Sequence, residues 1–126
     1  MKKRLTLTAA MSAGLFLLLS GNAWTGSNAL ARTTDWGVEQ GGVARFIHDG
    51  DKVSVCDGEA DGYGATATLR RHDGPIYATL NASGNGNCTS RTVDIREGEL
   101  LKLTVCLNDS AQPGRLFYCG SDPAQA

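Results

Sequence analysis

The 126-residue sequence lacks the motifs that mark most enzymes and nucleic-acid-binding proteins. It has no Gly-x-Ser-x-Gly motif for a nucleophilic serine and no Cys-x-x-Cys redox pair. The body of the chain has no cluster of lysine and arginine, which argues against a nucleic-acid partner. Beyond the N-terminal apolar run, no stretch repeats apolar residues every 3.6 positions, so helices are not expected. These absences favour an all-β protein and point to no reaction.

The N-terminal residues have the pattern of a secretory signal peptide. Three basic residues at positions 2–4 precede an apolar run at positions 5–19, which is shorter than the roughly 20 residues of a membrane span. A small-residue site, Ala-Leu-Ala, ends at Ala31, and we expect cleavage there, with Ala23 as the alternative. The sequence therefore predicts a signal peptide at 1–31 and a secreted, extracellular protein.

The predicted mature chain is small and acidic. Removing 31 of the 126 residues leaves 95, with nine lysines and arginines against thirteen acids, a net charge of −4. This charge opposes binding to anionic membranes, so no membrane partner is expected after cleavage. A chain of this size buries only about 60–65% of its unfolded surface, so disulfides should supplement the core.

Two segments of similar sequence organise the predicted fold: Lys52–Asp57 and Lys102–Leu107. Both alternate apolar and polar residues, contain a cysteine and follow an acidic, Gly-containing turn signal. With the other alternating segments they predict a small antiparallel β-sandwich of about seven short strands, a small β-barrel being the alternative. Residues 32–42 are expected to form a loose N-terminal arm, and residues 43–126 a single β domain that ends in a polar tail.

Alternation also predicts the direction of individual side chains. In the segment 76–80 it places Ile76 inward and Tyr77 outward. The Asn- and Gly-rich stretch 81–90 is predicted to be a loop. The residues at 93–96 alternate apolar and charged side chains, as a strand does.

Four cysteines in an exported chain predict two disulfides, and sequence alone allows three pairings. Cys56 and Cys106 each lie on the face of their strand opposite its aliphatic residues, so each should find a partner that lies over the outer face of its sheet. The next cysteines along the chain are Cys88 and Cys119, and we predict the pairs Cys56–Cys88 and Cys106–Cys119. The spacings of 32, 18 and 13 positions do not suit a zinc site.

A resemblance to small secreted actinobacterial proteins with two disulfides rests on three strings. These are the thirteen residues from Lys52 to Gly64, a later Asn-Gly-Asn-Cys-Thr, and a Thr-Val-Cys-Leu-Asn-Asp. The resemblance covers about Gly42 to Cys119. It implies export, a β-rich fold and two disulfides, and it brings no catalytic residues.

An acidic, Gly-rich loop is the candidate metal site. Asp57, Glu59 and Asp61 alternate along it and could supply oxygen ligands to Ca²⁺. The twelfth position counted from Asp57 is Thr68, so the loop is not an EF-hand, and a solvated turn is the simpler interpretation. We expect no cofactor.

Two histidines, His48 and His72, lie beside Asp-Gly turns. In a very small hydrolase either would act as a general acid or base together with nearby carboxylates. An exposed turn residue is the simpler interpretation of both.

Aromatic and arginine side chains dominate binding hot spots, so Tyr63, Arg70, Arg71 and Tyr77 are the predicted partner-binding residues. Trp36, Phe117 and Tyr118 are further candidate contacts. The sequence favours a non-catalytic secreted binding module for an extracellular protein or glycan, for example an inhibitor of an extracellular enzyme. The alternatives are the very small hydrolase and a calcium-dependent or carbohydrate-binding surface protein.

Overall fold

The computed structural model describes residues 26–34, 41–58, 62–84 and 86–126, which form eight strands and no helix. The described residues thus contain no helix long and apolar enough to cross a membrane. The strands are β1 (Ala29–Arg32), β2 (Gly42–Ile47), β3 (Lys52–Asp57), β4 (Tyr63–Arg71), β5 (Ile76–Ser83), β6 (Cys88–Thr92), β7 (Leu100–Asp109) and β8 (Leu116–Gln125).

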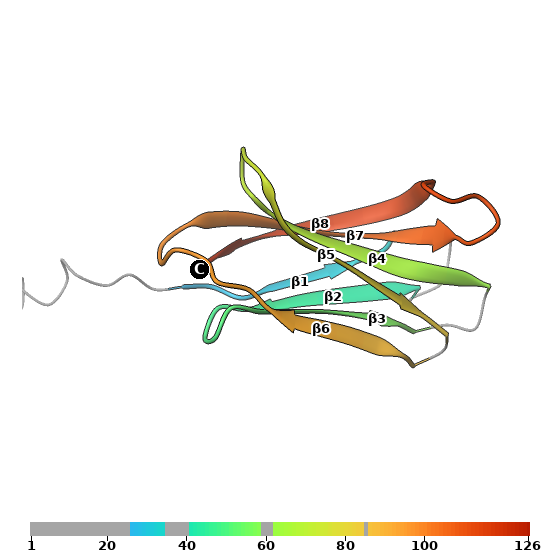
Figure 1. The fold of residues 1–126 in the computed structure, drawn as a ribbon, viewed down its shortest axis with the longest axis horizontal. Coiled ribbons are helices and arrows are strands. Elements are labelled where there is room, and N and C mark those ends of the chain that lie inside the picture. The colour runs from blue at the N-terminus through green and yellow to red at the C-terminus, as the bar shows by residue number, and fades with distance from the viewer. Residues whose placement is uncertain (1–25, 35–40, 59–61, 85) are drawn as a thin grey trace, which may run out of the picture.

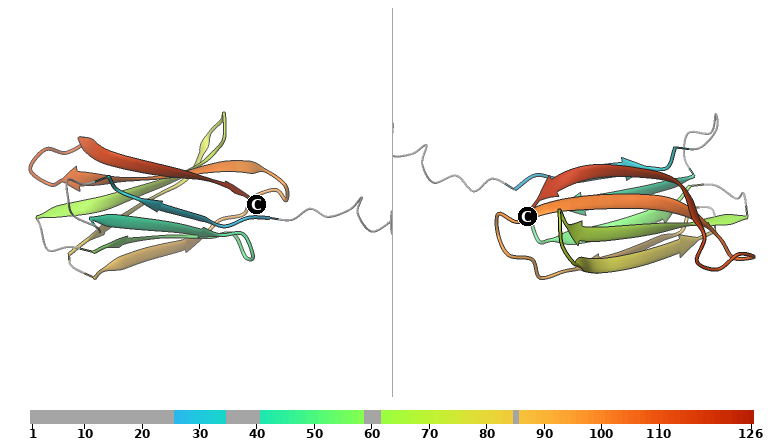
Figure 2. Two further views of the ribbon diagram at one scale, coloured as in Figure 1. Left: turned by 180° about the vertical axis from the view of Figure 1, so that it is seen from behind. Right: turned by 90° about the horizontal axis from the view of Figure 1, so that it is seen from above.

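The strands form two four-stranded antiparallel sheets, β1-β2-β3-β6 and β5-β4-β7-β8, which pack face to face (Figure 1). Seen from above, the sheet β5-β4-β7-β8 lies in front of the other (Figure 2). The core between them is made by inward side chains of both sheets, and Phe46, Val53, Leu69 and Leu103 are each at most 1% exposed. The predicted all-β sandwich is confirmed.

Strand β1 lies where the sequence predicts the end of a signal peptide. Its pairing with β2 runs from Ala29 opposite Phe46 to Arg32 opposite Val43. Ala29 and Ala31 are buried in the core. A boundary after Ala31 would therefore fall inside the strand, and the predicted arm would begin at the strand's last residue. The Ala-Leu-Ala pattern suits a peptidase, but it also suits a strand that packs its small residues inward.

Residues 120–126, predicted to be a polar tail, belong almost entirely to β8, which ends at Gln125. The predicted tail is wrong: its residues form a strand whose inward-facing side chains are small, and Ala124 and the C-terminal Ala126 are buried in the core. Gly120 lies so close to β1 that a Cβ there would overlap the Arg32 carbonyl oxygen. Small residues suit this close approach, and their weak apolar alternation concealed this part of the strand; a strand over residues 115–119 is predicted from the sequence.

The predicted loop 81–90 is partly strand, because residues 81–83 belong to β5 and residues 88–90 begin β6. The β6 side chains are mostly exposed because β6 is an edge strand. Apolar alternation therefore gives no signal for it. The alternating residues at 93–96 are not a strand; there the Val93 amide donates to the Asp51 carbonyl at 2.9 Å.

A β-bulge reverses the predicted directions of Ile76 and Tyr77. The register of β4 and β5 shifts so that Leu69 pairs with Ala78 but Arg70 with Ile76. One extra residue in a strand moves the residues beyond it to the other face. Ile76 is consequently 56% exposed, and Tyr77 is half-buried against the core.

Both predicted disulfides are confirmed, and each joins an edge strand to its neighbour. Cys56–Cys88 links β3 to β6, with a Cα–Cα distance of 4.0 Å. Cys106–Cys119 links β7 to β8, with a Cα–Cα distance of 4.1 Å. Two such bonds are compatible with an extracellular protein.

Candidate functional site

The four predicted partner-binding residues do not form one site, because they lie at opposite ends of β4. Tyr63 begins this nine-residue strand, and Arg70 and Arg71 end it. At the rise of a strand these ends are about 26 Å apart. Tyr77 follows the β4–β5 turn and lies at the arginine end.

At the arginine end, the polar side chains bond to each other. The Arg71 Nε is 2.8 Å from a carboxylate oxygen of Glu99, whose side chain is only 12% exposed. Partial burial raises the pKa of Tyr77, and its hydrogen bond to Glu99 and the charge of Glu99 raise it further. Arg70 donates to the Gly74 carbonyl at 2.9 Å. Because the contacts of this network are internal to the protein, we interpret Arg70, Arg71 and Tyr77 as residues that stabilise this end of the fold.

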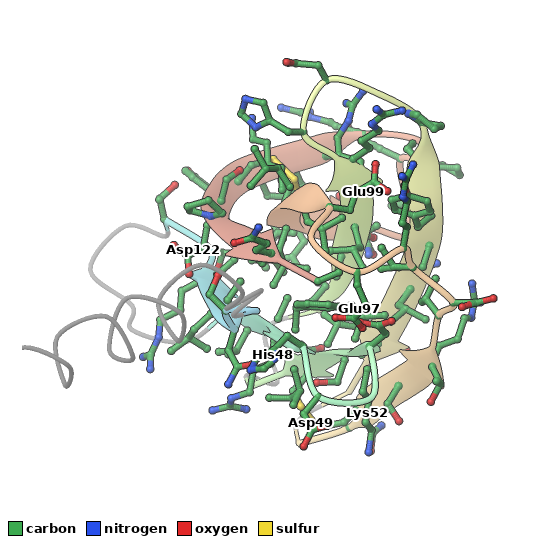
Figure 3. All side chains as sticks on the ribbon, turned by 90° about the vertical axis from the view of Figure 1, so that its left-hand side faces the viewer. His48, Asp49, Lys52, Glu97, Glu99 and Asp122 are labelled. Atoms are coloured by element: carbon green, nitrogen blue, oxygen red, sulfur yellow. A yellow bond between two sulfur atoms is a disulfide. The ribbon has the colours of Figure 1, made fainter. Side chains whose placement is uncertain are left out.

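A hollow of about 580 Å³ lies beside this network at the end of the molecule that Figure 3 shows, where Glu97 and Glu99 are labelled. Its charged lining is mixed: Arg71 and Arg96 face Asp73 and the two glutamates. Charges of both signs at close range compensate each other. The hollow therefore does not present charge of a single sign to a ligand.

The two histidines lie in turns of different sheets, His48 after β2 and His72 after β4. The His48 amide donates to the Asn28 side-chain oxygen at 2.9 Å, and the His48 ring lies against Gly26. The His72 ring is 60% exposed and 3.9 Å from Asp73, too far for a hydrogen bond. Within the described ranges neither ring is hydrogen-bonded to a carboxylate, the geometry that orients a catalytic imidazole.

Asp57, a predicted calcium ligand, is fully buried at the end of β3. Its carboxylate accepts the Gly84 amide at 2.9 Å, and its main chain bonds to Gly86 and Asn87. Asp57 thus fastens the β5–β6 loop to β3. Glu59 and Asp61 lie outside the described residues. Among the residues that are described, no three His, Cys, Asp or Glu side chains form a group suited to a metal ion.

The other end of β4 carries a group of aromatic side chains around an arginine. The Tyr63 and Phe117 rings meet edge to face with centroids 5.3 Å apart, and the Phe117 and Tyr118 centroids are 5.4 Å apart. The Arg115 guanidinium lies over Phe117 at 5.6 Å. Tyr63 and Tyr118 are 39% and 41% exposed. We call Tyr63, Arg115, Phe117 and Tyr118 the aromatic surface; it borders a hollow of about 490 Å³.

A bulge in β8 positions this surface. The register between β7 and β8 shifts opposite Cys106, where β8 carries an extra residue. Tyr118 lies there with a φ of +53°, a left-handed conformation that costs a non-glycine residue about 1–3 kcal/mol. Its carbonyl accepts the Thr34 amide at 2.9 Å, and the next residue, Cys119, is held by the disulfide. The surrounding structure therefore imposes this backbone conformation on Tyr118.

Sequence reasoning found only part of this surface. Tyr63 was a predicted binding residue, and Phe117 and Tyr118 were secondary candidates. Arg115 was missed, although it stands two positions before Phe117 in the chain. An arginine close to paired aromatics after a Pro-Gly turn was the available signal. The candidate Trp36 lies outside the described residues.

Fold and disulfides together define a small β-sandwich domain with two disulfides, each between neighbouring strands of one sheet. Comparisons with protein-family models, with curated proteins and with solved structures find no match to this chain.

Proposed function

We propose that this chain is an exported, non-catalytic module that binds an extracellular protein through the aromatic surface. The observation that carries the proposal is the half-exposed group of three rings and one arginine at the Tyr63 end of β4. Tyrosine and arginine are enriched in binding hot spots, where they bury a large area for few rotatable bonds. Export is supported by the signal-peptide pattern and by the two disulfides.

The rigidity of the surface supports a binding role. The disulfide between Cys106 and Cys119 closes the β7–β8 hairpin, and Tyr118 is held in a conformation that a free tyrosine seldom adopts. A backbone already fixed in place loses little conformational entropy on binding. Backbone strain of this kind concentrates at functional sites.

The shape of the hairpin supports the narrower proposal of an enzyme inhibitor. The loop between β7 and β8 projects from the end of the molecule opposite the C-terminus (Figure 1). Arg115, in this loop, is held by a 2.7 Å hydrogen bond to the Gln112 side chain. A projecting, disulfide-closed hairpin fits a concave partner such as an enzyme cleft.

A capture experiment with matched variants tests the proposal. Residues 24–126, with both disulfides formed, are immobilised and exposed to the extracellular proteins of the producing organism at physiological salt. The same is done with Tyr118→Asn and Arg115→Ala. Asparagine keeps the left-handed backbone accessible while removing the ring. Ile76→Ser is the control, because it removes an exposed apolar side chain at the opposite end of β4.

We expect mass spectrometry to identify one protein retained by the wild type and by Ile76→Ser, and lost by the other two variants. If the retained protein is an enzyme, its inhibition by the added domain supports the narrower proposal. Retention of one protein equally by all four forms would refute binding through the aromatic surface. Retention of none would refute an endogenous protein partner.

A further inference from the structure

The outer face of the sheet β1-β2-β3-β6 carries three cationic side chains. Their neighbours Ala31, Ala44 and Val53 are buried in the core, so Arg32, Arg45 and Lys52 point away from it. All three are exposed. Figure 3 shows Lys52 directed away from the sandwich.

The strand register arranges these three cations in a diagonal row. Arg32 lies opposite Val43, two positions before Arg45 on β2. Arg45 lies opposite Ser54, two positions after Lys52 on β3. Diagonal neighbours of this kind are about 7–8 Å apart in an antiparallel sheet. Positive charge thus recurs at regular steps across three strands.

The outward positions on the described residues of its four strands hold no acidic side chain. The other outward positions on its four strands are hydroxyl, cysteine and aliphatic residues. Within the described part of the chain, Arg32, Arg45 and Lys52 form no ion pair. Two of the described acids lie at the rim of this face: Asp49 follows β2 in the turn, and Asp122 accepts the Leu30 amide at 2.9 Å. Although the chain has more acids than bases, the charged outward residues on these four strands are all cations.

The accompanying residues favour an acidic polysaccharide over other polyanions. Ser54, Ser90 and Thr92 lie on the same face and can hydrogen-bond to sugar hydroxyl groups. Leu30 and Ile47, 41% and 38% exposed, offer a shallow apolar surface to a sugar ring. Single-stranded nucleic acids are usually bound by stacking their bases on aromatic side chains. None of the outward positions on the four strands of this sheet is aromatic, which argues against such a ligand.

We propose that this outer face, which we call the cationic face, binds an acidic polysaccharide whose carboxylate or sulfate groups pair with Arg32, Arg45 and Lys52. The site is separate from the aromatic surface, which is built mainly on β4 and β8 of the other sheet. The module would thereby attach to an acidic glycan while its aromatic surface holds a protein.

Two double variants with the same change in charge test this proposal. Arg45→Gln/Lys52→Gln removes two cations from the cationic face. Arg70→Gln/Lys102→Gln removes two exposed cations from the outer face of the other sheet. Binding of the purified, disulfide-bonded chain to oligogalacturonate, dextran sulfate, neutral dextran and single-stranded DNA is measured by calorimetry. Circular dichroism confirms that each variant is folded.

We expect the wild type to bind one or both acidic glycans but not neutral dextran. Its affinity for the acidic glycan should fall about tenfold when the salt concentration is raised from roughly 50 to roughly 200 mM. Arg45→Gln/Lys52→Gln should weaken binding about tenfold or more, and the other double variant less than about twofold. Whether oligogalacturonate or dextran sulfate binds more tightly identifies the carboxylate or the sulfate as the preferred group.

Equal losses in the two double variants would overturn the proposal in favour of a net-charge effect. Absence of binding to both acidic glycans would also overturn it. Tighter binding to DNA that depends on Arg45 and Lys52 would replace it with a nucleic-acid site. Tyr118→Asn should bind the glycan like the wild type, so this result does not depend on the proposed protein-binding function.

Discussion

Asp57 is an acidic residue that the fold uses for structure. Its carboxylate lies fully buried and accepts the Gly84 amide, so it holds the β5–β6 loop against β3. Alanine would leave that amide without its partner, which costs about 2–3 kcal/mol for a hydrogen bond to a charged group. We expect Asp57→Ala to lower the free energy of unfolding in urea by about this amount.

Asp57→Asn is the matched control, because it keeps an acceptor oxygen at the same place. It should lose less stability than Asp57→Ala. If Asp57→Ala unfolds with the same urea midpoint as the wild type, the structural role of Asp57 is contradicted, and the predicted role as a calcium ligand becomes the alternative.

Tyr77 should make the stability of the fold decrease as the pH becomes alkaline. Partial burial and the neighbouring Glu99 raise its pKa above the ordinary value of 10.0. The folded state therefore keeps the phenol proton at pH values where the unfolded chain has lost it. The stabilisation is complete below about pH 10 and is lost as the pH rises through the folded-state pKa.

We expect the unfolding free energy of the wild type to fall more steeply above about pH 10 than that of Tyr77→Phe, which cannot ionise there. Urea unfolding of both proteins at a series of pH values measures the difference between the curves. Parallel curves would show that the environment of Tyr77 does not oppose its ionisation.

At the scale of the element, β1 limits where a signal peptide can be cleaved without loss of folded structure. It contributes two buried alanines and covers the edge of β2. We therefore propose cleavage after Ala23, the alternative site, which leaves the strand intact. N-terminal sequencing of the exported chain should find Trp24 first.

The same strand predicts a difference between two truncations. A chain of residues 32–126 lacks Ala29 and Ala31. It should be less stable than residues 24–126 by about 2 kcal/mol or more, because the methyl groups of these alanines and the β2 side chains that they cover are no longer buried. Urea unfolding compares the two chains. Equal stability would contradict the structural contribution of β1.

At the scale of the whole molecule, the two disulfides should stabilise unequally. The Cys56–Cys88 bond spans 32 positions and the Cys106–Cys119 bond spans 13. Each should contribute about 2–4 kcal/mol, and the entropy of loop closure makes the longer bridge stronger by about 0.8 kcal/mol. The double Cys→Ser variants of each pair, unfolded in urea, test this order. A larger loss at the 106–119 pair would mean that holding the Tyr118 bulge outweighs loop entropy.

The molecule also distributes its charge in a way that no linear segment reveals. The described acids lie mainly in turns and at strand ends, whereas Arg32, Arg45 and Lys52 share one sheet face. In the sequence, 13 and 7 positions separate them, so they form no cluster there. The cationic face exists only once the strand register is set.

The sequence by itself determined what depends on local alternation and on cysteine order. Period-two segments identified most of the strands and the core positions of β3, β4 and β7, because each residue's direction follows from its neighbours. The outward positions of Cys56 and Cys106, taken with the order of the cysteines along the chain, led to the correct pairs, although each partner lies on the neighbouring strand of the same sheet. Tyr63 could be identified as a candidate binding residue because an aromatic residue beside a Gly-rich loop is recognisable from the local sequence alone.

Only the tertiary structure decided what depends on distant segments. The strand β1 and the second half of β8 were hidden because their small residues become a core only where two strands approach closely, as at Gly120 and Arg32. Tyr77 turned inward because of a bulge, a defect in pairing that alternation cannot show. The aromatic surface unites Tyr63 with residues more than fifty positions later, and it is the long-range pairing of β4, β7 and β8 that brings them together.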